Sequence, residues 1–259
     1  MSTQQLPITA LQKVRQFIRS GLTVPASENN PPQLSFEDDL PEPESLDALS
    51  DLFKFAGVSA TTNSRSGATG RWLVSVVNPG AILAKLPGLE LKPGWRLVSY
   101  LYREADHGLG VCWAVAETHS STANLEAALV GCKTQDQLPI PEGALGNFMD
   151  AITGDRSVRS FAIASMFYRE IKEFGALGNL QDWTHHHLIA TVPGKVNWQW
   201  QGDIPKNLAP KVRTFPDGRA ALEFFTCRVV APIAIYRHID LYLPDSYRAN
   251  GMSQAIATV

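Results

Sequence analysis

Residues 219–243, RAALEFFTCRVVAPIAIYRHIDLYL, decide the fold of this chain. Aromatic and β-branched residues are concentrated in two runs, which predict the strands Arg219–Val230 and Ile233–Leu243. The preceding Pro216-Asp217-Gly218 triplet is typical of a hairpin turn, because proline presets φ and glycine tolerates a positive φ. The C-terminal part of the chain is therefore predicted to be mostly sheet.

A block of predicted helices precedes this sheet. The helical segments are Ala123–Val130, Leu145–Thr153 and Val158–Phe174. Before the helices, Trp95–Glu104 and Val111–Glu117 are predicted to form a hairpin. Runs of strands around a block of helices are typical of an α+β protein, so we expect a mostly antiparallel sheet packed on two or three helices.

The remaining segments differ in composition from this region. Residues 1–20 place apolar side chains at helical spacing, whereas residues 21–53 contain eight acidic residues, five prolines and no basic residue. The residues beyond Tyr247 are small and polar. We expect four parts: an N-terminal amphipathic helix (1–20), a mobile acidic arm ending in a short helix (21–53), a single α+β domain (71–247) and a flexible tail (248–259).

The overall composition limits the class of protein. The chain has 259 residues, of which 44% are apolar and 19% charged, and its formal net charge is −2. It is therefore predicted to be globular, and it is not built mainly to neutralise phosphates. Three scattered cysteines, no secretory signal and no transmembrane segment favour the cytoplasm. The linear motifs of NTPases, kinases, α/β-hydrolases, zincins and dinucleotide-binding folds are absent from the sequence.

The acidic arm is the first candidate binding element. It carries a charge of −8, whereas the rest of the chain sums to +6. Such an arm is suited to dock on a basic partner or to fold back on the body. The acidic residues that we expect to contact a partner protein are Glu37, Asp38, Asp39, Glu42 and Glu44. The alternative is a solvated linker.

Three consecutive histidines, residues 185–187, are the second candidate. On a strand, His185 and His187 project from one face, and neutral imidazoles at alternate positions can bind Zn²⁺ or another divalent metal. Such a site needs a further ligand from elsewhere in the fold. The candidates for that ligand are His119, His238, Asp240 and Cys227. The alternative is that the imidazoles are solvated, or hydrogen-bonded in the core, without a cofactor.

The strand that closes the opening stretch carries the third candidate. Strict alternation places four residues on one face: Tyr236, His238, Asp240 and Tyr242. A carboxylate two residues from a histidine can fix the imidazole tautomer, so His238 and Asp240 are candidate catalytic residues for general base chemistry. The alternative is a solvated sheet face with cross-strand pairs.

Tryptophans and basic residues are interleaved between residues 195 and 219. Trp198, Trp200 and Lys211 are residue types that stack on bases and contact phosphates of a single-stranded nucleic acid. The two tryptophans also share a face with Val196, which is typical of a half-buried strand, Val196–Gln201. Because the whole chain is weakly acidic, a nucleic-acid partner is not our expectation.

Three stretches resemble an uncharacterised protein family of cyanobacteria. They are Lys85–Arg103 (KLPGLELKPGWRLVSYLYR), Phe148–Ser157 (FMDAITGDRS) and Val196–Lys206 (VNWQWQGDIPK). The resemblance covers most of the chain from about residue 71 and implies a bacterial cytosol. It implies no activity, cofactor or catalytic residue.

These observations favour a non-catalytic binding or regulatory protein that acts through protein–protein contacts, with the acidic arm as its docking element and no cofactor. One alternative is an enzyme or small-molecule binder that uses the histidine strand and the face of His238 and Asp240, with a divalent metal. Another is single-stranded nucleic-acid binding through Trp198 and Trp200.

Overall fold

A computed structural model describes residues 1–29, 70–194 and 196–259. Its strands are β1 (Ser2–Gln5), β2 (Arg71–Val74), β3 (Leu89–Leu91), β4 (Trp95–Glu104), β5 (His107–Ala116), β6 (Ile152–Gly154), β7 (His186–Ile189), β8 (Gln199–Trp200), β9 (Lys211–Thr214), β10 (Ala220–Arg228), β11 (Ala234–Tyr242) and β12 (Ala249–Thr258). Its helices are α1 (Ile8–Gly21), α2 (Ala26–Asn29), α4 (Pro79–Leu83), α5 (Thr122–Ala127) and α6 (Val158–Lys172), with the 3-10 turns η1 (Glu117–His119), η2 (Phe148–Ala151), η3 (Gly178–Leu180) and η4 (Trp183–His185). No helix in the described ranges combines the length and the apolar character needed to cross a membrane.

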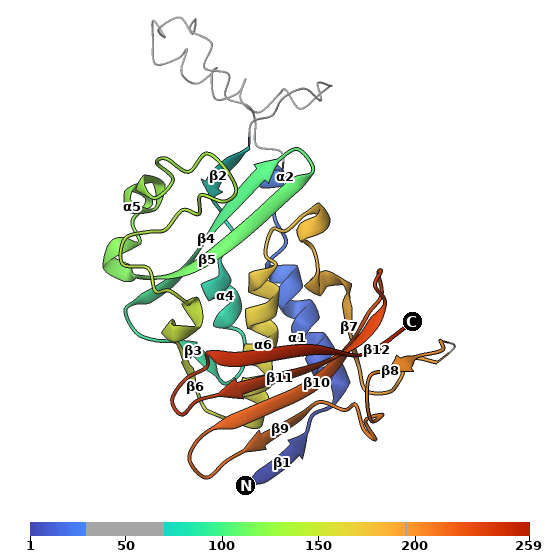
Figure 1. Ribbon diagram of the computed structural model, residues 1–259. Coiled ribbons are helices and arrows are strands. Elements are labelled where there is room, and N and C mark those ends of the chain that lie inside the picture. The colour runs from blue at the N-terminus through green and yellow to red at the C-terminus, as the bar shows by residue number, and fades with distance from the viewer. Residues whose placement is uncertain (30–69, 195) are drawn as a thin grey trace, which may run out of the picture.

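Seven strands form the larger sheet, in the order β1-β9-β10-β11-β12-β8, and β7 pairs with β10 next to β9 (Figure 1). All of these pairings are antiparallel. The predicted strands Arg219–Val230 and Ile233–Leu243 correspond to β10 and β11. The prediction of helices combined with a mostly antiparallel sheet is confirmed at this level.

A smaller sheet, β2-β4-β5, contains the predicted hairpin. β4 and β5 pair from Trp95 opposite Ala116 to Glu104 opposite His107. One face of this sheet forms a small core with α5, consisting of Trp72, Tyr100, Tyr102 and Leu125. A separate two-stranded ladder pairs β3, which lies between β2 and β4 in the chain, with β6, and β3 contacts α6.

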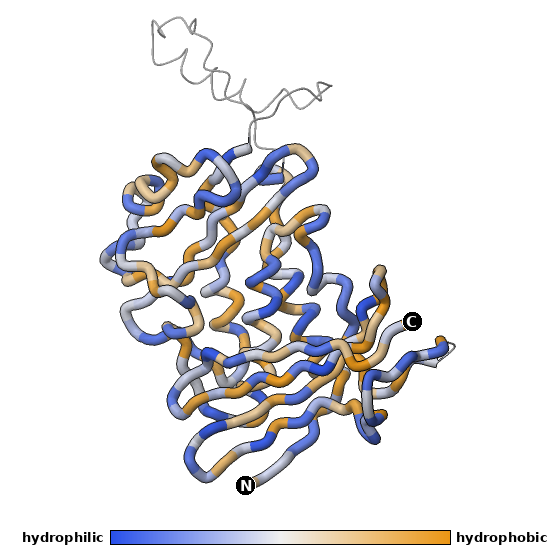
Figure 2. The backbone as a smooth tube through the Cα atoms, in the orientation of Figure 1, coloured by the Kyte–Doolittle hydropathy of each residue, from blue (hydrophilic) through white to orange (hydrophobic). Residues whose placement is uncertain are grey.

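The helix α6 holds the two sheets together. Ser157 caps its first turn by accepting a hydrogen bond from Ser160 N, and the helix contacts α1 and strands of both sheets. Apolar and polar residues alternate along the strands of the larger sheet (Figure 2), so one face is directed at the helices. The larger of the two cores therefore contains residues of both sheets, and its members include Leu11, Ile18, Leu101, Phe167 and Leu222.

Several predicted segments are wrong. Residues 249–258 are the strand β12, paired with β11 along its length, and Ala257 is fully buried, so there is no flexible tail there. Pairing with β11 orders these small residues, and composition does not reveal such pairing. The predicted helix Leu145–Thr153 is replaced by η2 and β6, because Thr153 pairs with Glu90 of β3. The N-terminal helix is α1, but it belongs to the shared core and is not a separate part.

Candidate functional site

The three consecutive histidines lie differently from the prediction. His185 ends the turn η4, and β7 begins only at His186. The turn is closed by a hydrogen bond from His185 N to Asp182 O, which removes His185 from the alternation of the strand. His186 is buried, whereas His187 is exposed. The predicted pair on one strand face, His185 with His187, is therefore wrong.

The candidate metal ligands do not form a group of three in the described part of the chain, and a metal centre stays a prediction. Within residues 1–29, 70–194 and 196–259, no three His, Cys, Asp or Glu side chains are grouped so as to hold a metal ion. His187 lies opposite Cys227 in the β7–β10 ladder, but burial raises the pKa of that thiol. His119 lies in η1, where its ring contacts the Glu142 carbonyl.

His186 and His238 are instead joined through a buried threonine. Thr226 Oγ1 lies 2.8 Å from His186 Nδ1 and 2.8 Å from His238 Nε2. The other ring nitrogen, His238 Nδ1, lies 2.8 Å from Ser253 Oγ on β12. The first three residues are buried and Ser253 is exposed. We call this row, His186–Thr226–His238–Ser253, the polar chain; it leads from the core to the outer edge of the larger sheet.

The polar chain has one hydrogen-bond direction. The hydroxyl of Thr226 has a single proton, so it donates to one histidine and accepts from the other. Asp182 Oδ1 lies 3.8 Å from His186 Nε2, and this carboxylate favours a proton on that nitrogen. Thr226 then donates to His186 Nδ1 and accepts from His238 Nε2. Ser253 in turn donates to His238 Nδ1.

Burial keeps both histidines neutral. Desolvation lowers the pKa of His186 to about 4 and that of His238 to about 2, and the Arg169 cation contributes to the second shift. A serine that donates to a histidine is the arrangement of a nucleophile and its base, but the base must accept a proton during the reaction. The His238 imidazolium is destabilised by both causes. Burial and the Arg169 charge therefore disfavour proton transfer from Ser253 to His238.

Asp240 binds a different partner from the predicted one. Its carboxylate accepts hydrogen bonds from the two terminal nitrogens of Arg169, at 2.6 and 2.8 Å, and from the Ser165 hydroxyl at 2.6 Å. Thr226 and Ser253 occupy both ring nitrogens of His238, so the predicted general base of His238 and Asp240 does not form. The two side chains share one face of β11, as predicted, but that face is buried and not solvated.

The tryptophans predicted to contact nucleic acid do not form a basic surface with Lys211. Trp198 donates its Nε1 hydrogen to the Pro193 carbonyl at 3.0 Å. Lys211 Nζ lies 2.6 Å from Glu223 Oε2, so its charge is compensated. The strand β8 contains only Gln199 and Trp200, and is shorter than predicted. The geometry does not favour the nucleic-acid alternative.

The outer edge of β12 is the site that the geometry supports best. In an antiparallel ladder, alternate residues direct their N–H and C=O groups to the same neighbour. The hydrogen bond from Phe215 N to Arg219 O fixes this alternation across β10, β11 and β12. Gly251 and Ser253 therefore direct their main-chain groups outward, before the register shift at Ala255. Among the described residues, only β8 pairs with this edge, at its C-terminal end.

A crevice lies beside this edge. A cavity of about 280 Å³ is lined by β12 and by Tyr168, Arg169 and Lys172 of α6. A second cavity, of about 360 Å³, shares Tyr168 and Lys172 and continues to β5. Asp240 compensates Arg169, whereas Lys172 is exposed and forms no ion pair with any described residue. The crevice between β12 and β5, which we call the β12 crevice, thus carries a net positive charge.

The acidic docking residues of the predicted arm lie outside the described residues; they are Glu37, Asp38, Asp39, Glu42 and Glu44. The structure describes the start of this arm up to Asn29. There Glu28 is buried and accepts hydrogen bonds from Val76 N at 2.6 Å and from the Ser75 hydroxyl at 2.7 Å. The first residues of the arm are therefore anchored on the smaller sheet.

Sequence reasoning missed the β12 edge because small polar residues at 249–258 were interpreted as a frayed end. One feature of the sequence points to it: these ten residues contain no charge and no proline, which is unusual for a solvated tail. Lys172 is exposed on α6. Its position beside β12 depends on tertiary packing and has no local signature.

Comparisons of the chain with family models, with curated proteins and with solved structures find no match. The resemblance to a cyanobacterial family stays a prediction. The site is therefore interpreted from its geometry.

Proposed function

We propose that this protein is a non-catalytic binding protein that takes up an extended segment of a partner protein as an additional strand on β12. One observation carries the proposal: Gly251 and Ser253 present outward main-chain groups without a strand partner among the described residues. Proteins usually protect such an edge with charged residues or proline, and β12 contains neither. Main-chain pairing gives affinity in this binding mode, and side-chain pockets give specificity.

The β12 crevice supports an acidic segment as the preferred occupant. Side chains of an added strand that face inward lie above α6, where Lys172 supplies an uncompensated positive charge. A carboxylate at this position pairs with Lys172, whereas a basic side chain is repelled. The β12 crevice therefore favours acidic strands over basic ones, whereas main-chain pairing at the edge does not depend on sequence.

The polar chain has a supporting role in this proposal. The hydrogen bond from Ser253 to His238 holds the middle of the edge strand at a fixed position. Because both histidines are neutral, this bond is not lost near neutral pH. The edge is therefore preformed, which lowers the entropic cost of adding a strand.

The acidic arm remains a proposed second docking element. Its charge of −8 suits a basic surface on the same partner. Changing Glu37, Asp38, Asp39, Glu42 and Glu44 to the corresponding amides tests this contribution separately. We expect weaker binding at low salt and the same binding at high salt, because such contacts between exposed charges are screened.

The test of strand addition uses Ser253→Pro with Ser253→Ala as its matched control. Both variants lose the hydroxyl bond to His238, but only proline removes the outward N–H. Peptides are selected from a random linear library on the full-length protein, and their affinities are measured by calorimetry. We expect acidic peptides that bind the wild type and Ser253→Ala alike, and that bind Ser253→Pro at least tenfold more weakly. Equal binding to Ser253→Pro would refute strand addition.

A further inference from the structure

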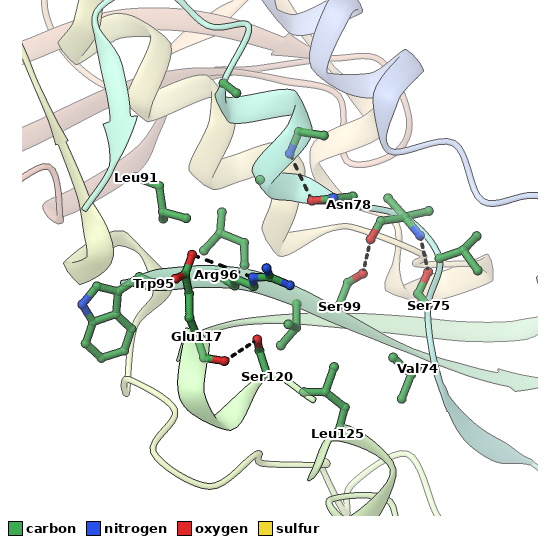
Figure 3. A pocket seen from close by; sticks show the side chains of 17 residues that line it. Val74, Ser75, Asn78, Leu91, Trp95, Arg96, Ser99, Glu117, Ser120 and Leu125 are labelled. Carbon is green, nitrogen blue, oxygen red and sulfur yellow. Dashed lines mark hydrogen bonds and ion pairs between the residues drawn. The ribbon is translucent and has the colours of Figure 1, made fainter. Parts of the chain in front are cut away.

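A groove of about 660 Å³ lies on the smaller sheet, away from β12 (Figure 3). Its floor is the first half of β4, from Trp95 to Ser99. In the figure, α4 runs above this strand, and Ser120 and Leu125 lie below it. The groove belongs neither to the polar chain nor to the β12 crevice.

The groove exists because β2 is shorter than the strand with which it pairs. Ser75 N donates to Ser99 O at 2.9 Å, and this is the final main-chain hydrogen bond between the β2 segment and β4. Beyond it, Glu28 accepts hydrogen bonds from the Ser75 hydroxyl and Val76 N, and the chain turns into α4. The edge of β4 before Ser99 is left without a neighbouring strand among the described residues.

One main-chain donor and one acceptor face this empty position. Ser99 directs its carbonyl to β2, so Leu97, two residues earlier, directs its N–H and C=O to the same side. The bond from Glu117 N to Gly94 O agrees with this alternation on the β5 side. Neither Leu97 N nor Leu97 O forms a hydrogen bond with another described residue. The N–H and C=O of Leu97 can therefore exchange two hydrogen bonds with one residue of an added antiparallel strand.

The walls of the groove are apolar and its charges cancel. Among the lining residues are Val74, Leu91, Trp95, Val98 and Leu125. The hydroxyl groups are already engaged: that of Ser99 donates to the Val77 carbonyl, and that of Ser120 to the Glu117 carbonyl. At the rim, Arg96 Nε lies 3.9 Å from Glu117 Oε1. The groove thus presents the main-chain N–H and C=O of Leu97 among apolar side chains, and it has no net charge.

We infer that this groove is a second binding site, and that its occupant is an extended, uncharged peptide segment with apolar side chains. The segment continues the line of β2 along β4 and exchanges two hydrogen bonds with Leu97. Continuity with the β2–β4 ladder sets its direction, antiparallel to β4. The absence of net charge separates it from the acidic segment proposed for β12.

The inference is tested on the full-length protein with the capped peptide N-acetyl-Val-Leu-Val-amide, by nuclear magnetic resonance. In the free protein, the Leu97 amide is expected to exchange faster than those of Arg96 and Val98, which bond to β5. On addition of the peptide, its resonance shifts and its exchange slows. Analogues with lysine or glutamate at the central position bind more weakly. A Leu97 amide unperturbed by millimolar peptide, or tighter binding of a charged analogue, would overturn the inference.

Two substitutions of exposed alanines localise the binding. Ala84, the residue that caps the C-terminal end of α4, lines the groove, and Ala84→Trp fills it; Ala127→Trp on α5 is the matched control outside the lining. We expect at least tenfold weaker binding for the first variant and no change for the second. Ser253→Pro leaves this binding unchanged, so failure of the β12 proposal does not affect the result. Equal binding to Ala84→Trp and wild type would place the peptide elsewhere.

Discussion

Buried charged side chains hold α1 and α6 against the larger sheet. Arg15 is 8% exposed although its spacing places it on the polar side of α1, and its Nε lies 2.6 Å from Glu170 Oε1. Arg169 and Asp240 form the corresponding pair between α6 and β11. Such a pair adds little stability compared with apolar packing, but removal of one partner leaves an uncompensated charge in the interior.

The substitution Asp240→Asn is expected to lower the free energy of unfolding by about 3–5 kcal/mol, because it leaves the buried Arg169 cation without its counter-charge. Asp217→Asn, in the exposed pair with Arg219, serves as a control and is expected to change little. Urea unfolding measures both variants. An equal loss in the two variants would contradict the buried pair.

The two neutral histidines make stability depend on pH. Their folded pKa values, about 4 for His186 and about 2 for His238, lie below the ordinary value of 6.5. The unfolded state therefore binds more protons as the pH falls below 6.5, and stability decreases. Each histidine is expected to lower the free energy of unfolding by about 2 kcal/mol between pH 6.5 and pH 5.

Urea unfolding at pH 7.5 and pH 5 measures this dependence. His238→Gln removes one titrating group and is expected to halve the difference between the two pH values. His187→Gln, at an exposed position on the same strand as His186, is expected to leave the difference unchanged. A wild-type protein equally stable at both pH values would show that the histidines are not held neutral.

At the scale of elements, the sequence predicts those helices and strands whose signals lie within a single segment. The hairpin of β4 and β5 and the helix α6 were predicted within a few residues, because apolar periodicity, a cap and a turn lie within each segment. The strand β12 was missed because pairing with β11 orders it. The candidate site residues His238 and Asp240 were placed on the correct face, but their partners come from β10, β12 and α6, which no local pattern connects.

The strand β12 has a testable signature in hydrogen exchange. The amides of Asn250, Met252 and Gln254 bond to β11, whereas those of Gly251 and Ser253 face outward. We therefore expect slow exchange at the even positions and fast exchange at the odd positions, measured residue by residue by nuclear magnetic resonance. Uniformly fast exchange across these residues would instead support the predicted flexible tail.

At the scale of the whole molecule, the shared core decides how the parts depend on one another. Leu11 and Ile18 of α1 belong to the same core as Leu101 of β4 and Leu222 of β10. The predicted boundary at residue 71 therefore separated parts that pack together. The sequence contains the apolar face of α1, but the surface that it covers is formed by α4, α6 and β7, which are distant along the chain.

Ile18→Ala is expected to lower the stability of both sheets together. Ile18 is fully buried, so the cavity left by the substitution costs about 2–5 kcal/mol. Phe17→Ala, at a 40% exposed position on the same helix, is the control and costs less. Unfolding is followed by circular dichroism and by tryptophan fluorescence, and the two midpoints are expected to fall together. Separate midpoints would show that the two sheets unfold independently.

The order of strands in the larger sheet also constrains how the protein is made on the ribosome. β1, formed by residues 2–5, pairs with β9, whereas β12, which pairs with β11, is formed by residues 249–258. The apolar face of α1 emerges early, yet α6 and β7, which it contacts, are translated more than a hundred residues later. The large sheet can therefore be completed only after nearly the whole described chain has left the exit tunnel, and until then the apolar face of α1 lacks its native neighbours.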